Sequence, residues 1–327
     1  MKICTLGCGK QSEKYAGSLK KRGITDIVVT DVDAGARAAF AEMFGARTFE
    51  TLDEVLAEGG LDGAMICTPL PSHTPLATQL IEAGIPFMCE KPLAATVGDV
   101  ETLVALASER GVKGGITFTY RYAPAFETLR EVLADPAAPL GTIRSAVFRV
   151  GGRGNHRFWK HRKPDGGVTH ELFSHMLDLA VWLFGEFDNL DVCFQKQVFP
   201  TRKIGGVEEP VDAEDATLVT GRTSGGVECV FVSDFYTPSF TQYLEVQGEN
   251  GAYFGSIQPI HPARLVLNAP AGAYAKGVNE LAKPGNPVDS IVGELLDVIA
   301  GTGSFRCPLE DALVTQRHMQ SVLAQID

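Results

Sequence analysis

Up to about residue 120 the chain alternates short β-rich runs with helical runs, and this alternation limits the possible folds more than any other pattern in the sequence. Strands that alternate with helices pair in parallel through right-handed crossovers, and the result is a doubly wound sheet. The expected strands are 2–7, 26–31, 47–50, 63–69, 86–90 and 113–119. The first part of the chain is therefore predicted to be an α/β domain built on a doubly wound parallel sheet.

Turn and capping residues mark the helices between these strands. One helix is predicted from Ser12 to Arg22. Another covers "SHTPLATQLIEAG", where Ser72 can cap the N-terminus and Gly84 can end the helix.

After about residue 121 the pattern changes, because several strands follow one another with glycine turns between them. Helices are predicted around 124–134 and 167–184, and again around 288–300 and 309–326, while 269–287 reads as a surface loop. Consecutive alternating strands indicate a large open, mostly antiparallel sheet in an α+β domain. The predicted strands are 143–150, 190–199, 216–223, 227–236, 243–249, 251–256 and 264–268. Two domains are expected, 1–120 and 121–327.

Composition limits the classes of partner. A chain of 327 residues that is 45% hydrophobic can build two cores. The net charge of −11 argues against nucleic acid or an anionic membrane as the main partner, and no apolar stretch is long enough to span a membrane. The basic stretch 153–163 is expected to be a solvated or anion-facing loop. The odd number of cysteines, seven, fits free thiols, and the first residues run directly into a strand, so a cytoplasmic location is expected.

The stretch "THELFSHMLD", residues 169–178, resembles at first the zinc-binding pattern H-E-x-x-H. His170 and His175 are however five residues apart, which places them about 140° apart around a regular α-helix. No metal is therefore expected. Glu171, His175 and Asp178 follow the spacing i, i+4, i+7 and are predicted to share one helix face.

A glycine turn, "LGCGKQS", lies between the first strand and the first helix. Gly7 permits a tight turn, and Gly9 lets the backbone approach a pyrophosphate held at the helix N-terminus. Ser12 stands where a third glycine is usual and is small enough for close helix packing. The turn predicts a dinucleotide-binding site of the Rossmann type; a plain turn is the alternative.

The second strand ends in Asp31, 22 residues after Gly9, where an acidic residue accepts hydrogen bonds from the adenosine ribose. A 2′-phosphate would be repelled by this carboxylate, and neither Val32 nor Asp33 supplies an arginine. The sequence therefore predicts NAD rather than NADP. The alternative is that Asp31 only ends a strand.

The fourth and fifth strands end in "CTPLPSH" and "CEKPLA", at the sheet edge where doubly wound folds bind ligands. With these motifs the chain resembles the Gfo/Idh/MocA oxidoreductases, a resemblance that also rests on "YRYAPAF", Trp159 before "DGG", and "HELFSHMLDLAVWLFGE". Cofactor contacts are expected from the following residues: Gly7, Gly9, Gln11, Ser12, Asp31, Thr68, Pro69, His73, Glu90 and Lys91.

The resemblance implies the catalytic residues. Lys91 matches the lysine that lies beside nicotinamide and substrate in the family, and an ammonium beside a cationic ring is suited to acid/base work. The family commonly makes the bond before Pro92 cis. His175 matches the family's acid/base histidine. Glu171 stands where many members carry aspartate, so its hydroxyl recognition cannot be copied from them.

Substrate contacts are expected from Arg121, Tyr122, His156, Glu171 and His175. Arg121 has an alternative role, pairing with a carboxylate of the fold. If the basic loop with Arg153 and Arg157 lines the pocket, an acidic or phosphorylated sugar is favoured.

These expectations combine into an NAD(H)-dependent oxidoreductase that transfers a hydride between nicotinamide and a secondary alcohol or carbonyl of a sugar, inositol, polyol or sugar acid. Two alternatives stay open: redox-neutral, NAD-dependent glycosidase or lyase chemistry, and a non-catalytic NAD-binding regulator. The resemblance also implies a homodimer or homotetramer formed through the open sheet of the second domain.

Overall fold

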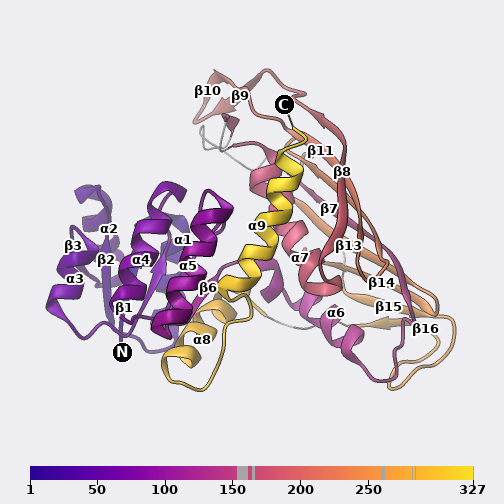
Figure 1. The fold of residues 1–327 in the computed structure, drawn as a ribbon, viewed down its shortest axis with the longest axis horizontal. Helices are drawn as coiled ribbons and strands as arrows, with labels where there is room; N and C mark the ends of the chain where they lie inside the picture. Colours follow the sequence, from indigo (N-terminus) through magenta and orange to yellow (C-terminus); the bar gives the residue numbers. More distant parts are fainter. Residues whose placement is uncertain (153–160, 164–165, 259–261, 282, 284, 327) are drawn as a thin grey trace. The chain divides into compact units, whose positions relative to one another are not determined.

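The computed structural model describes residues 1–152, 161–163, 166–258, 262–281, 283 and 285–326. It divides into two compact units. The first contains Met1–Tyr122 and Gly285–Gln316, and the second contains Ala123–Pro284 and Arg317–Asp327. The ribbon in Figure 1 follows the chain through both.

The first unit is the predicted doubly wound sheet. Its six strands are all parallel and lie in the order β3-β2-β1-β4-β5-β6. The strands are β1 (Lys2–Leu6), β2 (Asp26–Thr30), β3 (Arg47–Phe49), β4 (Gly63–Ile66), β5 (Phe87–Cys89) and β6 (Gly114–Ile116). The helices are α1 (Lys10–Lys21), α2 (Ala34–Phe44), α3 (Leu52–Glu58), α4 (His73–Glu82), α5 (Val97–Arg110) and α8 (Pro287–Ile299), with 3-10 turns η1 (Leu70–Ser72) and η2 (Thr119–Tyr122).

The sheet of the first unit is covered on both faces because its strands are apolar on both sides. In β2, Ile27 and Val29 belong to the core shared with α1, α2 and α8, whereas Val28 belongs to the core shared with α3, α4 and α5. Such continuous apolar runs are what a parallel sheet buried between helices requires. The predicted fold class of this part is confirmed.

The first unit also takes in a late segment of the chain, which the contiguous division at residue 120 did not foresee. The inner face of α8 buries Ile291, Val292 and Leu295 in the core that contains Leu19 of α1. In addition the Ser18 hydroxyl donates to Oδ1 of Asp289 at 2.6 Å. The boundary in sequence therefore differs from the boundary in space, because α8 covers one face of the parallel sheet.

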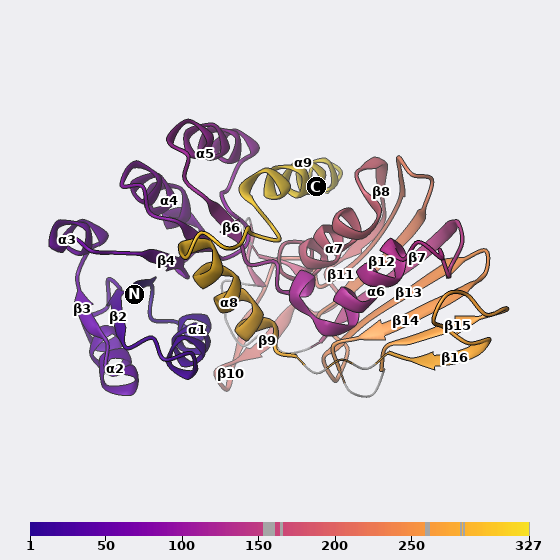
Figure 2. The same ribbon diagram turned by 90° about the horizontal axis from the view of Figure 1, so that it is seen from below.

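The second unit holds the predicted large, mostly antiparallel sheet. Its order is β16-β15-β14-β13-β7-β12-β11-β8, and among its pairs only β12 with β7 is parallel. The strands are β7 (Ile143–Gly151), β8 (Phe187–Lys196), β11 (Ala216–Thr223), β12 (Glu228–Asp234), β13 (Thr241–Gly248), β14 (Gly251–Ser256), β15 (Arg264–Leu267) and β16 (Gly277–Glu280). Figure 2 shows the strands side by side.

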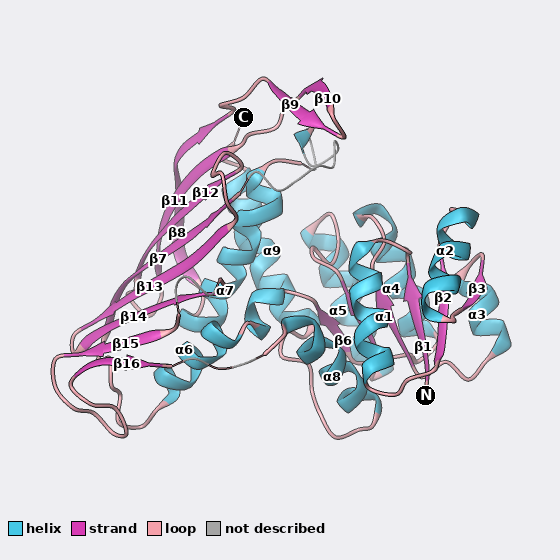
Figure 3. Cartoon of the chain, turned by 180° about the vertical axis from the view of Figure 1, so that it is seen from behind, coloured by secondary structure: helices cyan, strands magenta, loops and turns pink. Residues whose placement is uncertain are grey.

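Helices cover one face of this sheet. They are α6 (Pro124–Ala134) and α7 (Ser174–Phe184), which Figure 3 shows on the same side. Along β13, Leu244 and Val246 are fully buried, while Tyr243 and Glu245, which alternate with them, are partly exposed. The hydroxyl of Tyr253 on β14 donates to the carbonyl of Ala125 in α6. The covered face is therefore the apolar one, and the other face is left partly open.

The secondary structure also departs from the sequence predictions in strands and at a helix cap. Strands β9 (Thr201–Ile204) and β10 (Val207–Pro210) form a hairpin around two glycines that periodicity did not predict. Strand β16 lies in the segment predicted as a loop, because its backbone pairs with β15 although its residues are weak strand formers. The Ser72 hydroxyl does not cap α4 and donates instead to the carbonyl of Pro69. Gly84, with φ +75°, ends that helix as predicted.

Candidate functional site

The glycine turn lies between β1 and α1, as predicted. Gly7 has φ +98°, and a Cβ there would stand 2.9 Å from the carbonyl oxygen of Cys67. Both the conformation and the close approach to the end of β4 thus require glycine. Gly9 is the N-cap of α1, and a Cβ there would meet nothing within 4 Å. The N-terminus of α1 is therefore open to a ligand at the point where a pyrophosphate is expected.

Ser12 and Gln11 follow in the first turns of α1. Ser12 is fully buried, which agrees with its expected role of allowing close packing at the third-glycine position. Gln11 is partly exposed, and its side-chain oxygen accepts a hydrogen bond from Nζ of Lys14 at 3.2 Å.

Asp31 follows β2 directly and faces the glycine turn. Its Oδ2 accepts a hydrogen bond from the backbone N–H of Cys8 at 2.7 Å, and its Oδ1 accepts from the N–H of Asp33 at 2.9 Å. Burial, with Asp31 adding to the effect, raises the pKa of the Cys8 thiol to about 12, so the thiol stays neutral. Each carboxylate oxygen keeps further acceptor capacity for ribose hydroxyls.

The prediction of NAD over NADP considered arginines only at positions 32 and 33, and this was incomplete. Arg37 of α2 donates from a terminal guanidinium nitrogen to the backbone carbonyl of Asp31. Its side chain is largely buried, and a 3.5 Å ion pair joins its other terminal nitrogen to Glu50. An arginine is therefore present beside Asp31, although the carboxylate itself still faces the turn.

The turn after β4 supplies Thr68, which is partly exposed, and Pro69, which is exposed. The hydroxyl of Thr68 is buried and has no hydrogen-bond partner among the residues that the structure describes. Because buried polar groups are nearly always paired, a hydroxyl left over at this edge is suited to a ligand. The open helix end at Gly9, the acceptor Asp31 and this hydroxyl together fit a dinucleotide.

His73, the first residue of α4, was predicted as a cofactor contact. The structure shows a ring that is 2% exposed and lies between two turns. Its Nδ1 lies 2.8 Å from the carbonyl oxygen of Pro92, and its Nε2 lies 2.8 Å from that of Thr68. Both ring nitrogens are thus used within the protein.

Lys91 lies in the turn after β5 and is partly exposed, and the Lys91–Pro92 bond is cis. Before it, Glu90 donates its backbone N–H to Ile66 at 2.9 Å and accepts the hydroxyl of buried Tyr15 at 2.7 Å. Burial, and next the Glu90 carboxylate, raise the pKa of Tyr15 well above its usual range, so this hydroxyl remains a donor. The residues on both sides of Lys91 are therefore fixed.

Arg121 and Tyr122 were predicted as substrate contacts, and the structure uses both inside the first unit. Arg121 is fully buried and pairs with Oδ2 of Asp311 at 2.5 Å, which is the alternative that the sequence left open. The hydroxyl of Tyr122 donates to Oε2 of Glu294 at 2.5 Å, and its ring lies under the guanidinium of Arg306. Burial raises the pKa of both Tyr122 and Glu294. These side chains have no exposed surface with which to contact a substrate, so the expectation is corrected.

The helix of the second unit that carries Glu171 and His175 is not regular. Thr169–Phe173 forms a π-helical turn, and α7 continues from Ser174. The wider turn changes the predicted pattern: His170, Glu171, Leu172 and His175 are partly exposed, whereas Asp178 is fully buried. Glu171 and His175 thus reach the surface of the helix as expected, but Asp178 does not share that exposure.

Sequence reasoning missed His170 as a neighbour of this partly exposed group, because the 140° separation applies only to a regular α-helix. Single π-turns within helices occur often at functional sites. No periodicity in the sequence signals the π-turn.

His156, Arg153, Arg157, Lys160 and Trp159 lie outside the described residues. Within the described ranges, no group of three or more His, Cys, Asp and Glu side chains is arranged to hold a metal ion. No helix among those same residues combines the length and apolar character that crossing a membrane would take.

Two family models match most of the chain. Residues 1–118 match the oxidoreductase family with an NAD-binding Rossmann fold, Gfo/Idh/MocA, and residues 126–254 match the Gfo/Idh/MocA C-terminal domain. Among curated relatives, inositol 2-dehydrogenase of Rhizobium meliloti is 25% identical, over 76% of this chain and 73% of its own length. D-apiose dehydrogenase of Paraburkholderia graminis is 28% identical, over 75% and 65%.

For several curated relatives the match spans less than two thirds of their length, for example 56% of myo-inositol dehydrogenase Hyg17 of Streptomyces leeuwenhoekii. Solved structures cover nearly the whole chain. A levoglucosan dehydrogenase, crystallised with NADH and levoglucosan, superposes with a TM-score of 0.86 at 16% identity, covering 99% of this chain and 96% of that one. GenD2 from gentamicin A biosynthesis, in complex with NAD, has a TM-score of 0.80 at 24% identity, covering 99% and 93%.

These structural likenesses show the fold, and the family models show the family. The chain belongs to the Gfo/Idh/MocA oxidoreductases, and residues 1–118 are its NAD-binding Rossmann domain.

Proposed function

We propose that this protein is an NAD(H)-dependent dehydrogenase or reductase acting on a secondary alcohol or carbonyl of a sugar, inositol, polyol or sugar acid. Bound NAD would accept or supply the hydride. The observation that carries the proposal is Lys91, a partly exposed ammonium fixed by its neighbours at the edge of a sheet that otherwise fits a dinucleotide. The inositol and apiose dehydrogenases among the relatives support this substrate class.

The proposed work of the protein side chains is proton transfer and orientation. Oxidation of an alcohol requires a group that takes the hydroxyl proton, and we assign this to Lys91 and His175. We assign Glu171 to hydrogen bonding with substrate hydroxyls, since a carboxylate accepts bonds from two of them. Gly7, Gly9, Asp31 and Thr68 hold the cofactor. His156 remains a proposed substrate contact on the family resemblance alone.

The first test is nicotinamide absorbance when the protein and NAD⁺ meet a panel of neutral sugars, inositols, uronates and sugar phosphates. Wild type should reduce NAD⁺ with at least one of them. Lys91→Met should lose about 100-fold or more in kcat, within the range of acid/base contributions, while the variant still binds NADH through the glycine turn and Asp31. Lys113→Met is the matched control, because that lysine lies at the other end of the β-strands and bonds the carbonyl of Gly303.

The same measurement separates the alternatives. A substrate consumed without net change in nicotinamide absorbance would replace the proposal with redox-neutral chemistry. NADH bound tightly with no substrate consumed and no effect of Lys91→Met would support a regulator instead. Oxidation in which Lys91→Met matches wild type would leave the dehydrogenase but remove the lysine from its proposed role.

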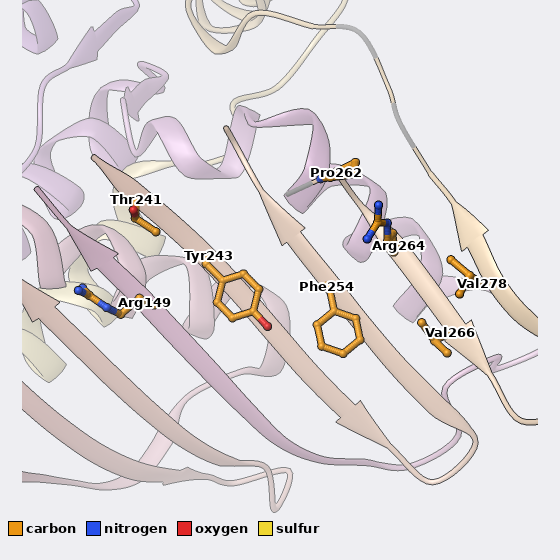
Figure 4. A pocket seen from close by; sticks show the side chains of 8 residues that line it. All are labelled: Arg149, Thr241, Tyr243, Phe254, Pro262, Arg264, Val266 and Val278. Atoms are coloured by element: carbon orange, nitrogen blue, oxygen red, sulfur yellow. The ribbon is translucent and has the colours of Figure 1, made fainter. Parts of the chain in front are cut away.

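We further propose that the open face of the large sheet joins two copies of the chain. This face has a shallow hollow of about 540 Å³ lined by Arg149, Thr241, Tyr243, Phe254, Pro262, Arg264, Val266 and Val278 (Figure 4). Val278 is 64% exposed, and Tyr243 and Phe254 stand on the side of the sheet opposite α6. Exposed apolar patches framed by charged groups are typical of protein interfaces.

The oligomer is tested by sedimentation velocity of wild type and of Val278→Lys with Tyr243→Lys. Wild type should sediment as a dimer or tetramer and the double variant as a smaller species. A wild-type monomer at micromolar concentration would refute this interface.

Cytoplasmic location is proposed on chemical grounds, since all seven cysteines are free and three of them are buried in strands of the first sheet or beside it. Cell fractionation would test it.

A further inference from the structure

The hydrogen bonds of His73 do not fit a neutral ring. The imidazole is buried, and each of its two nitrogens lies 2.8 Å from a backbone carbonyl oxygen, one of Pro92 and one of Thr68. A carbonyl oxygen only accepts. A neutral imidazole has one N–H and one lone pair, so it can satisfy one of these contacts and must oppose the other.

No other placement of the ring removes the conflict. If the ring turned over about its Cβ–Cγ axis, two carbon atoms would face the carbonyl oxygens and both hydrogen bonds would be lost. Either neutral tautomer sets a lone pair against an oxygen at hydrogen-bond distance. With both nitrogens protonated, both contacts become charge-assisted hydrogen bonds.

We propose that His73 is an imidazolium that ties the turn after β4 to the turn after β5, and that it is thereby a positioning residue for Lys91. The role toward Lys91 rests on the proposed function; the tie itself does not. This role differs from the direct cofactor contact expected from the sequence.

Burial and the positive N-terminal end of α4 oppose a cation at this place. The two carbonyl oxygens favour it, because charge-assisted hydrogen bonds are roughly twice as strong as neutral ones. The charged residues of the turn after β5 are Glu90, whose carboxylate accepts the Tyr15 hydroxyl, and Lys91. The other titratable groups at the ends of β4 and β5 are Cys67 and Cys89, whose thiols burial keeps neutral by raising their pKa. The charged side chains of α5, which packs beside α4, are Asp99, Glu101, Glu109 and Arg110.

The tie acts on Lys91 through the backbone. β4 and β5 are adjacent parallel strands, so the two turns lie at the same sheet edge. Tyr15 holds Glu90 from one side of Lys91, and His73 holds the carbonyl of Pro92 on the other. Loss of the second bond frees the turn on one side, and displacement of a catalytic group by about 1 Å can lower a rate 100-fold.

The protonation state is read directly by long-range ¹H–¹⁵N NMR of the intact chain labelled with ¹⁵N-histidine at pH 7. Both nitrogens of His73 should resonate as protonated. His318 is the internal reference for a neutral ring, because its Nε2 accepts the N–H of Phe187 at 3.3 Å and burial lowers its pKa. His73→Gln and His318→Gln assign the two signals; if His73→Gln does not fold, replacing the other six histidines singly assigns His73 by elimination. A bare nitrogen on His73 at pH 7 overturns the proposal.

The positioning role has a separate readout that needs no substrate. Hydrogen exchange of the Cys67 and Glu90 amides, which bond the carbonyls of Leu6 and Ile66, should be about tenfold faster in His73→Gln than in wild type. The Gly7 amide, bonded to Thr30, should not change and is the control. In turnover, kcat should fall about 10- to 100-fold with KM for the substrate little altered.

These readouts separate failure of the inference from failure of the proposed function. Protonated nitrogens with unchanged exchange at both amides would refute the positioning role. Protonated nitrogens and faster exchange in a protein that oxidises none of the substrates would uphold the tie and reject the dehydrogenase.

Discussion

Replacing Asp31 by serine should by itself shift the cofactor preference of the protein from NAD toward NADP. The carboxylate is placed by two backbone N–H groups, of Cys8 and Asp33, so that it faces the glycine turn. Arg37 donates to the backbone carbonyl of Asp31 and not to its carboxylate, so the substitution leaves the arginine in place. Serine removes the charge that repels a 2′-phosphate and keeps a cation that attracts one.

The size of the effect follows from the hydrogen bonds lost. A hydrogen bond to a charged group contributes about 1.5–3 kcal/mol. Loss of one ribose bond to Asp31 should therefore weaken NADH binding by about 1.5–3 kcal/mol, or roughly 10- to 150-fold at 1.4 kcal/mol per tenfold. NADPH should bind Asp31→Ser more tightly than it binds wild type. Adding Arg37→Met to Asp31→Ser should weaken NADPH binding again.

The assay is titration of nicotinamide fluorescence with NADH and NADPH, which needs no substrate. Arg22→Met is the control in the Asp31→Ser background, because Arg22 also donates to a backbone carbonyl, that of Asp289, but at the far end of α1. A ratio of NADH to NADPH affinity that stays at the wild-type value in Asp31→Ser would refute the reasoning. If NADPH binding were gained but Arg37→Met had no effect on it, Asp31 would act alone.

Three further outcomes are expected. Arg121→Met should lower the unfolding free energy by about 2 kcal/mol and leave KM unchanged. The loss is smaller than for a fully buried ion pair because Asp311 is 43% exposed. A raised KM with unaltered stability would instead indicate that Arg121 contacts the substrate. Gly7→Ala should weaken NADH binding at least tenfold and destabilise the protein by about 1–3 kcal/mol, since φ is +98° and the methyl would meet Cys67; calorimetry and fluorescence titration measure both. Burial lowers the pKa of His318 in the folded protein below its usual value of 6.5. The stability that the neutral ring contributes is therefore present above pH 6.5 and is lost as the pH falls through the folded pKa. The unfolding free energy measured in urea should fall more on acidification for wild type than for His318→Gln, and parallel pH curves for the two proteins would contradict this.

Much of the fold was predictable because local sequence patterns carry it. Apolar runs such as Ile27 to Val29, bounded by polar and turn residues, can only be strands buried on both sides. Gly7 was identifiable because its position excludes a side chain, and Gly9 because its position leaves room for a ligand. The order of motifs then identified the family, which the family models confirmed.

One error arose where distant segments meet, and two arose from local geometry that the sequence pattern does not signal. Arg121 has the same local sequence whether it faces a pocket or pairs with Asp311, which is 190 residues away. Arg37 lies one helical turn into α2, so a search of the residues beside Asp31 did not include it. The π-turn at Thr169–Phe173 departs from the 3.6-residue period on which the prediction for Asp178 depended.

The local sequence was enough to predict the two kinds of sheet, the glycine turn, the acidic end of β2 and the lysine that follows β5, because each depends on neighbours within a few residues. The folded chain was needed to show that α8 completes the first unit, that Arg121 is buried with a carboxylate, and that both nitrogens of His73 face carbonyl oxygens. Those outcomes depend on contacts between segments, and the sequence around each residue does not indicate which other segment it will contact. Hydrogen-bond partners are chosen in space, after the strands and helices have packed.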